Sequence, residues 1–193
     1  KISKIYGIFN GTSNYILSSM DKQNKNFQEV LSIAKKLGYA ESNPTSDLNG
    51  DDVSSKLKIL SSLCFNSFLS DNIYVEGIKE IDTVDINNAN KLGYKIKLLG
   101  FAELLNNNIY QRVHPTLIKK DTYVASIDGV LNAVIIDGKP VGQSIIQGEG
   151  AGPAATTSAL ISDISSILRG NIKFPFSISS KERKKYKYNT IDE

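Results

Sequence analysis

The sequence predicts an α+β domain in which a mixed, mostly antiparallel sheet is covered by helices on one face. Two observations carry this prediction. In the first third of the chain apolar residues recur at helical spacing, whereas from about residue 95 onward the period changes to that of paired strands. Strands and helices do not alternate over a stretch long enough for a doubly wound parallel sheet.

The composition is that of a globular chain without extreme charge. Its 193 residues are 40% hydrophobic and include five prolines, and the formal net charge is +3. The single cysteine, Cys64, excludes an intrachain disulfide and fits a reducing compartment. No apolar run approaches the about 20 residues of a membrane span, and the first residues lack the apolar region of a signal peptide. We therefore expect a cytoplasmic protein without membrane contact.

The first two elements are predicted to be a strand and a helix. Residues 2–9 are rich in β-branched and aromatic side chains and stop at the Asn-Gly pair at 10–11, which predicts a strand followed by a tight turn. Thr12 or Ser13 is then expected to cap a helix that runs to about Met20.

Two further helices are predicted on either side of a polar loop. Asn26 is expected to cap a helix over 27–37, in which apolar residues recur at helical spacing, and Gly38 sits just past its end. A turn-forming loop with Pro44 follows, and apolar spacing then predicts a helix over about 51–64.

The rest of the domain is predicted to be mostly strands. In order, we expect an irregular segment at 65–83, a short helix at 84–93, one antiparallel pair at 95–104 and 109–118, and a second pair at 130–136 and 141–148. The last residues, 171–193, are polar and basic without periodicity, which predicts an arm or linker after a domain over 1–170.

The stretch from 38 to 56 gathers polar side chains between two helices. Asp52 and Lys56 are four residues apart, so their side chains share one helix face and can point into a cleft. Glu41 and Asp47, from the loop before this helix, can line the same cleft. The other interpretation is a solvated acidic loop with one ion pair that contributes about 0.3–0.5 kcal/mol. Spacing alone leaves both open. A calcium loop does not fit, because the glutamate at its twelfth position is absent, and no metal site is predicted.

A second candidate is the glycine-rich segment at 147–164, where a strand runs into Gly148, Gly150 and Gly152 and then into a helix. Free N–H groups at a helix start attract a phosphate. A glycine-rich turn without a ligand is the other interpretation, since no parallel strand with an acidic end follows, as a complete dinucleotide fold would require.

Three smaller features are expected to be structural. His114 precedes a proline inside a strand, and Cys64 lies on an apolar helix stripe, so neither is predicted to react. The basic segment 181–188 could bind nucleic acid through charge and stacking, but a solvated arm fits the small net charge better. No nucleic-acid partner is therefore expected.

The stretch at 38–56, with the helix before it, also resembles a known family. It reads Ala34-x-x-x-Gly38-Tyr39-Ala40-Glu41-x-Asn43-Pro44-x-x-Asp47-Leu48-x-Gly50-x-Asp52-x-x-x-Lys56. These 23 residues resemble the signature of homoserine dehydrogenases. Further segments resemble the same family: GIFNGTSNYIL at 7–17 and GEGAGPAATTSALISDI at 148–164.

The resemblance implies an oxidoreductase that interconverts L-aspartate 4-semialdehyde and L-homoserine with NADP or NAD, in the biosynthesis of threonine, methionine and isoleucine. It implies that Lys56 donates the proton, with Asp52 beside it. The remaining implied site residues are, for the substrate, Glu41, Asp47, Asp52, Thr12, Gly11 and Tyr39, and for the cofactor, Gly38 and Gly152.

The resemblance further implies that the dinucleotide is bound mainly by an N-terminal Rossmann domain outside this chain, where a sodium site and a second active-site lysine would also lie. Longer members carry a regulatory ACT domain beyond the other end. We therefore expect a substrate-binding, catalytic and dimerisation domain that forms a homodimer and is inactive alone. The alternative is a dimerisation module without catalytic function.

Overall fold

The computed structural model describes residues 1–171 and 180–189. Its elements in order are β1 (Ile2–Ile8), α1 (Gly11–Gln23), α2 (Phe27–Lys36), α3 (Thr45–Asn49), α4 (Asp51–Phe65), β2 (Tyr74–Val75), α5 (Thr83–Lys91), β3 (Tyr94–Leu105), β4 (Asn108–Lys119), η1 (Val124–Ser126), β5 (Leu131–Gly138), β6 (Gly142–Glu149), α6 (Pro153–Leu168), η3 (Ser180–Glu182) and β7 (Lys187–Asn189), where η marks a 3-10 helix.

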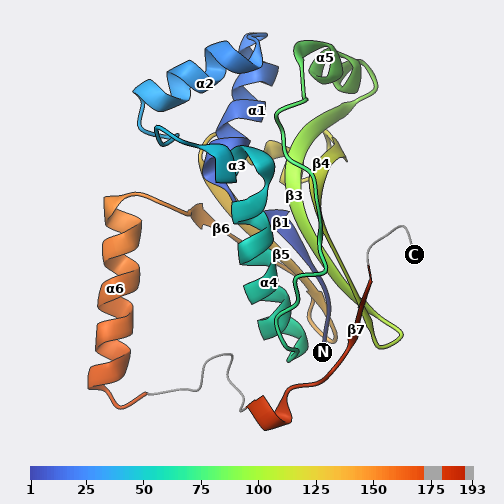
Figure 1. Ribbon diagram of the computed structural model, residues 1–193, viewed down its shortest axis with the longest axis vertical. Helices are drawn as coiled ribbons and strands as arrows, with labels where there is room; N and C mark the ends of the chain where they lie inside the picture. Colours follow the sequence, from blue (N-terminus) through green and yellow to red (C-terminus); the bar gives the residue numbers. More distant parts are fainter. Residues whose placement is uncertain (172–179, 190–193) are drawn as a thin grey trace.

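A single mixed sheet organises the described chain. Its strand order is β2-β4-β3-β1-β5-β6, and β7 also pairs with β4. Among the named strands of the described residues, only the pairings β2–β4 and β4–β7 are parallel. Helices α1 and α4 lie over one face of the sheet (Figure 1). The predicted α+β class, with a mostly antiparallel sheet covered by helices on one face, is confirmed.

Both predicted strand pairs are confirmed as hairpins. β3 and β4 stay in register from Tyr94 opposite Lys119 to Leu105 opposite Asn108. The turn residues Asn106 and Asn107 have φ angles of 49° and 62°. Asparagine tolerates this left-handed region, and two such residues make the tight turn whose twist matches paired strands.

Capping boxes start two of the helices. At the start of α2 the Asn26 side chain accepts the Glu29 backbone N–H, and the Glu29 side chain accepts the Asn26 backbone N–H. Asp82 and Asp85 form the same reciprocal pair at the start of α5. Each box satisfies two backbone N–H groups that a helix start leaves free, so these helices begin close to where the sequence predicts.

The main core lies between the sheet and its helices. Val53 and Leu57 of α4 are fully buried in one cluster with Ile5 of β1 and Leu98 of β3. The apolar spacing of α4 thus faces the sheet, as predicted. A smaller cluster lies on the other face of the sheet, where Ile8, Leu99 and Ile135 pack against η1.

Lys97 of β3 is a buried charge beside α1, with a side chain that is 1% exposed. Its Nζ donates to the Ile127 carbonyl at 2.6 Å, to Asp128 Oδ1 at 2.7 Å and to Asn14 Oδ1 at 3.0 Å. Burial lowers the pKa of Lys97 against the opposing effect of Asp128. Although burial acts to raise it, the hydrogen bonds from Lys97 and Lys22 bring the pKa of Asp128 down to about 2. This cluster ties α1 to β3 and to the segment after η1.

The start of α1 differs from the prediction. The N-cap is Asn10, whose Oδ1 accepts the Ser13 backbone N–H at 2.8 Å. Thr12 and Ser13, which the sequence favoured as caps, lie inside the first turn, and the helix runs past Met20 to Gln23. The prediction was wrong because an asparagine before a glycine indicates a tight turn and an N-cap equally well.

Five short elements were not predicted, namely α3, β2, η1, η3 and β7. The 38–56 loop contains α3, a single turn held by a hydrogen bond from the Leu48 N–H to the Pro44 carbonyl. The irregular segment contains β2, and β7 pairs with β4 inside the predicted C-terminal arm. Elements of two to five residues carry too little periodicity to be read from sequence. The rest of the predicted arm, at 172–179 and 190–193, lies outside the described residues, and the division at residue 170 stays a prediction.

Helix α6 stands apart from the sheet and the other helices (Figure 1). None of its residues is buried, and it exposes apolar side chains, among them Leu160, Ile161 and Ile164. Among the described residues there is no helix with the length and apolar character needed to span a membrane.

Candidate active site

A cleft of about 540 Å³ opens between the start of α1, the 38–56 stretch and the glycine-rich segment before α6. Every residue that the sequence and the resemblance proposed for the site lines it: Lys56, Asp52, Glu41, Asp47, Thr12, Gly11, Tyr39, Gly38 and Gly152. Residues far apart in the chain therefore meet in one place. Their individual roles stay predictions.

Lys56 lies in this cleft on the second turn of α4. Its Nζ donates to Asp52 Oδ2 at 2.8 Å and to the Phe9 backbone carbonyl at 2.9 Å. The side chains of Lys56 and Asp52 are 43% and 29% exposed, so the pair contacts solvent. An ammonium has three N–H donors, and these two contacts leave one for a ligand in the cleft.

Asn10 joins the two aspartates of the site. Its Nδ2 donates to Asp47 Oδ1 at 2.7 Å and to Asp52 Oδ2 at 2.9 Å, while its Oδ1 caps α1. One buried amide thus orders the first turn of α1 and holds two carboxylates from α3 and α4. Within the part of the chain that the structure describes, the second oxygens of Asp47 and Asp52 have no hydrogen bond, so they are free to accept one.

Thr12 and Tyr39 hold the loop against α1. Thr12 Oγ1 donates to the Tyr39 carbonyl at 2.6 Å, and the ring of Tyr39 packs against Tyr15 with centroids 4.9 Å apart. Gly38, at φ +75°, makes the left-handed turn that ends α2 and starts this loop. Glu41 lines the cleft with an exposed side chain that makes no hydrogen bond or ion pair with the described residues.

The opposite wall comes from β5 and the glycine-rich segment. Asn132 of β5 donates from Nδ2 to the Phe9 carbonyl at 3.3 Å. A β-carbon on Gly150 would lie 1.9 Å from that Nδ2, so only a glycine fits against the amide as it stands. Gly152 has φ +111° and open space where a β-carbon would be. Its backbone can therefore be approached closely from the cleft.

Three groups that form hydrogen bonds within the site were missed from sequence. They are the side chains of Asn10 and Asn132 and the backbone carbonyl of Phe9. Asn10 could have been found, because an Asn-Gly pair before a helix is also an N-cap signal. Asn132 gave no signal, since a polar residue in a strand is ordinary, and a backbone carbonyl has no sequence mark at all.

The other sequence features lie away from the cleft. His114 of β4 contacts the Pro115 carbonyl through Nδ1 at 2.8 Å and lies edge-on to Tyr74. Cys64 is half-buried, and this burial raises the pKa of its thiol. In the described ranges no three His, Cys, Asp or Glu side chains are grouped to hold a metal ion.

The homoserine dehydrogenase family model matches residues 1–165. The chain belongs to the homoserine dehydrogenase family. The homoserine dehydrogenase of Pseudomonas aeruginosa is 42% identical over 176 residues, which are 91% of this chain and 41% of that protein. The homoserine dehydrogenase of Helicobacter pylori is 46% identical over 164 residues, 84% of this chain and 39% of that protein.

Solved homoserine dehydrogenases share the fold. A crystal structure of the enzyme from Thiobacillus denitrificans has a TM-score of 0.92 and 38% identity, covering 98% of this chain and 46% of that one. A hyperthermophilic archaeal homoserine dehydrogenase mutant in complex with NADPH has a TM-score of 0.72 and 26% identity, covering 88% of this chain and 48% of that one. The chain spans about two fifths of the length of the curated homoserine dehydrogenases named above.

Proposed function

We propose that this chain is the substrate-binding and proton-donating part of an enzyme that interconverts L-aspartate 4-semialdehyde and L-homoserine. One observation carries the proposal: the Lys56 ammonium lies in the cleft, is held at two of its three N–H groups, and has carboxylates on one side. Family membership supports the reaction. The cytoplasmic location stays a prediction from the sequence.

The aldehyde end of the substrate is assigned to Lys56. When a hydride adds to the aldehyde carbon, its oxygen becomes negative, and an ammonium at hydrogen-bond distance stabilises and then protonates it. In the reverse direction the same amine accepts the hydroxyl proton of L-homoserine. Asp52 and the Phe9 carbonyl hold the Lys56 ammonium in place, so this group is already positioned before the reaction begins.

The amino end of the substrate is assigned to the carboxylates. Asp47 and Asp52 each keep one oxygen without a hydrogen bond to the described residues, and Glu41 is exposed on the same cleft. An α-ammonium group donates well to such oxygens, because charge-assisted hydrogen bonds are the strong ones. Three acids beside one lysine thus suit a substrate that carries both an ammonium and a carbonyl.

The nicotinamide cofactor would lie against the glycine wall of the cleft. Gly38 and Gly152 both have positive φ and open space at the β-carbon position, which fits the close approach of a flat ring or a phosphate to the backbone. The dinucleotide, when bound, supplies the hydride. A related homoserine dehydrogenase mutant is known in complex with NADPH.

Lys56→Ala in the full-length enzyme tests the proposal. We expect kcat to fall about a hundredfold or more with a smaller change in KM, because the ammonium acts as charge develops on the substrate oxygen. Lys58→Ala, on the same helix but paired with Asp71 on the surface, is the matched control and should keep kcat. An unchanged kcat with a raised KM for Lys56→Ala would show that Lys56 only binds substrate.

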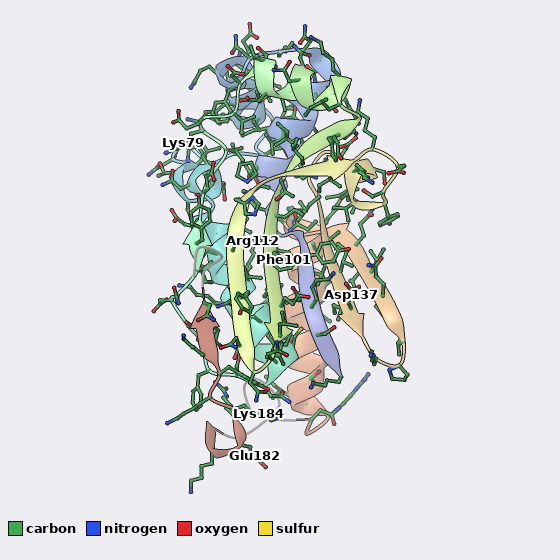
Figure 2. All side chains as sticks on the ribbon, turned by 90° about the vertical axis from the view of Figure 1, so that its right-hand side faces the viewer. Lys79, Phe101, Arg112, Asp137, Glu182 and Lys184 are labelled. Carbon is green, nitrogen blue, oxygen red and sulfur yellow. The ribbon has the colours of Figure 1, made fainter. Side chains whose placement is uncertain are left out.

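We also propose that the enzyme is a homodimer that uses the face of the sheet opposite the helices. Figure 2 shows Phe101, Arg112 and Asp137 along this face, with no helix of the drawn chain over them. The Arg112 guanidinium lies 4.6 Å from the centre of the Phe101 ring, and Tyr6 packs beside that ring. Aromatic residues and arginine are the types enriched at protein interfaces.

Sedimentation velocity tests the dimer. We expect two copies per particle for the full-length enzyme and a shift to monomer for Phe101→Glu, since a charge at the centre of an apolar contact is costly to desolvate. Val84→Glu, at an exposed apolar position on α5, is the control and should leave the dimer intact. A wild-type monomer at micromolar concentration would contradict the proposal.

A further inference from the structure

Asn132 is a polar side chain of the cleft to which the proposed mechanism gives no role. Its Nδ2 donates to the Phe9 carbonyl at 3.3 Å, and its Oδ1 is buried with no hydrogen-bond partner among the described residues. A buried acceptor without a partner destabilises the fold, and an apolar side chain of the same size would avoid that penalty. Asparagine donates an N–H to the Phe9 carbonyl, which an apolar residue cannot do.

The Phe9 carbonyl is shared between Asn132 and Lys56. Lys56 Nζ donates to it at 2.9 Å and to Asp52 Oδ2 at 2.8 Å. The three N–H groups of an ammonium point to the corners of a tetrahedron, so two fixed acceptors also fix the direction of the third N–H. The position of this carbonyl therefore decides where the remaining proton of Lys56 points.

The ring of Phe9 is fixed independently of its carbonyl. It packs over β3, where a β-carbon on Gly100 would lie 2.6 Å from a ring carbon. The residue itself lies between the end of β1 and the start of α1, outside both elements. Because packing of the ring does not fix the plane of the peptide that carries the Phe9 carbonyl, the hydrogen bonds to that carbonyl set its orientation. Asn132 donates one of these hydrogen bonds.

Gly150 holds the amide of Asn132 from the other side. Because a β-carbon at Gly150 would lie 1.9 Å from Nδ2, an alanine there is incompatible with the amide in its present position against the Phe9 carbonyl. Gly148, in the same segment and directly opposite Asn132 on β6, has open space at its β-carbon position. The two glycines are therefore a matched pair for testing the amide without changing Asn132 itself.

We propose that Asn132 is a positioning residue for Lys56: its amide orients the Phe9 carbonyl, and that carbonyl aims the third N–H of the ammonium at the substrate oxygen. This rests on the proposed function, in which Lys56 donates the proton. Asn132 does not touch the reacting atoms in this arrangement. Its effect on the reaction passes through Lys56 alone.

A double-mutant cycle in the full-length enzyme tests the proposal. Asn132→Ala is expected to lower kcat about tenfold to a hundredfold with KM within about twofold, since a displacement of about 1 Å at a reacting group has effects of this size. In Lys56→Ala the additional Asn132→Ala change is expected to have no further effect on kcat, because the ammonium to be aimed is gone. Additive losses, or a normal kcat for Asn132→Ala, would overturn the proposal.

The glycine pair gives a second, independent comparison. Gly150→Ala is expected to lower kcat as Asn132→Ala does, whereas Gly148→Ala keeps it, with both variants folded by circular dichroism. This pair decides the question if Asn132→Ala does not fold. Equal kcat for the two glycine variants would overturn the proposal. A normal kcat for Lys56→Ala would instead refute the proposed function, and with it any role of Asn132 in aiming Lys56.

Discussion

At Asp128 the charge of one side chain is linked to the stability of the fold. Asp128 accepts a hydrogen bond from the buried Lys97 and pairs with Lys22 at 2.9 Å, and its pKa is lowered from 3.8 to about 2. A carboxyl group whose pKa is depressed by folding stabilises the fold above its unfolded pKa and loses that contribution as the pH falls through its folded pKa. For Asp128 that window is from about pH 4 to about pH 2.

We expect the free energy of unfolding of this chain to fall by about 2 kcal/mol across that window through Asp128 alone. Urea unfolding at pH 5 and pH 2.5 measures it, and Asp128→Asn should lower the stability at pH 5 and flatten the dependence on pH. Asp71→Asn is the control: Asp71 is 96% exposed and pairs with Lys58 on the surface, where such pairs contribute little. Equal acid sensitivity of the wild type and Asp128→Asn would contradict the prediction.

At the scale of elements, the start of α1 connects helix stability to the cleft. Asn10 caps the helix through Oδ1 and bridges Asp47 and Asp52 through Nδ2. Asn10→Ala is therefore expected to lower stability by about 1 kcal/mol and to raise the KM for L-homoserine, because the two carboxylates lose their common donor. Thermal unfolding and steady-state kinetics of the full-length enzyme measure the two effects.

Asn26→Ala separates these effects. Asn26 caps α2 through a capping box and does not line the cleft, so this variant should lose similar stability and keep its KM. A raised KM for both variants would mean that loss of stability alone disturbs the site. An unchanged KM for Asn10→Ala would show that the aspartates hold their places without it.

The longer elements could be predicted from the sequence because each repeats its signal over several turns or residue pairs. α4 repeats its apolar spacing along its 15 residues, with Val53 and Leu57 buried in the core. β3 and β4 pair along 12 residues each and flank an Asn-rich turn. β7 could not be predicted, since its three residues pair with β4 through backbone groups that every sequence has. The site residues likewise differ in how far they could be predicted. Lys56 and the acids beside it were indicated by their sequence pattern. The role of the Phe9 carbonyl could not be predicted, because its position depends on where β1 ends.

At the scale of the whole molecule, the cleft is lined by one chain that spans about two fifths of its curated relatives. We expect these 193 residues alone to show no hydride transfer from NADPH or NADH to L-aspartate 4-semialdehyde, because the resemblance assigns most of the dinucleotide contacts to segments outside them. Absorbance at 340 nm measures the turnover, with the full-length enzyme as the positive control. Robust turnover by the chain alone would contradict this expectation.

The place of β1 in the middle of the sheet has a consequence for protein synthesis. Tyr6 of β1 pairs with Phe101 on one side and with Ile135 on the other, so both neighbours of this strand are translated long after it. At about 5–20 residues per second, Tyr6 leaves the ribosome roughly 6 to 26 s before Ile135. Both edges of this strand stay open until β3 is made, and the edge that pairs with β5 stays open for the whole interval. We therefore expect the nascent chain to bind a holdase chaperone through β1 until β5 is made.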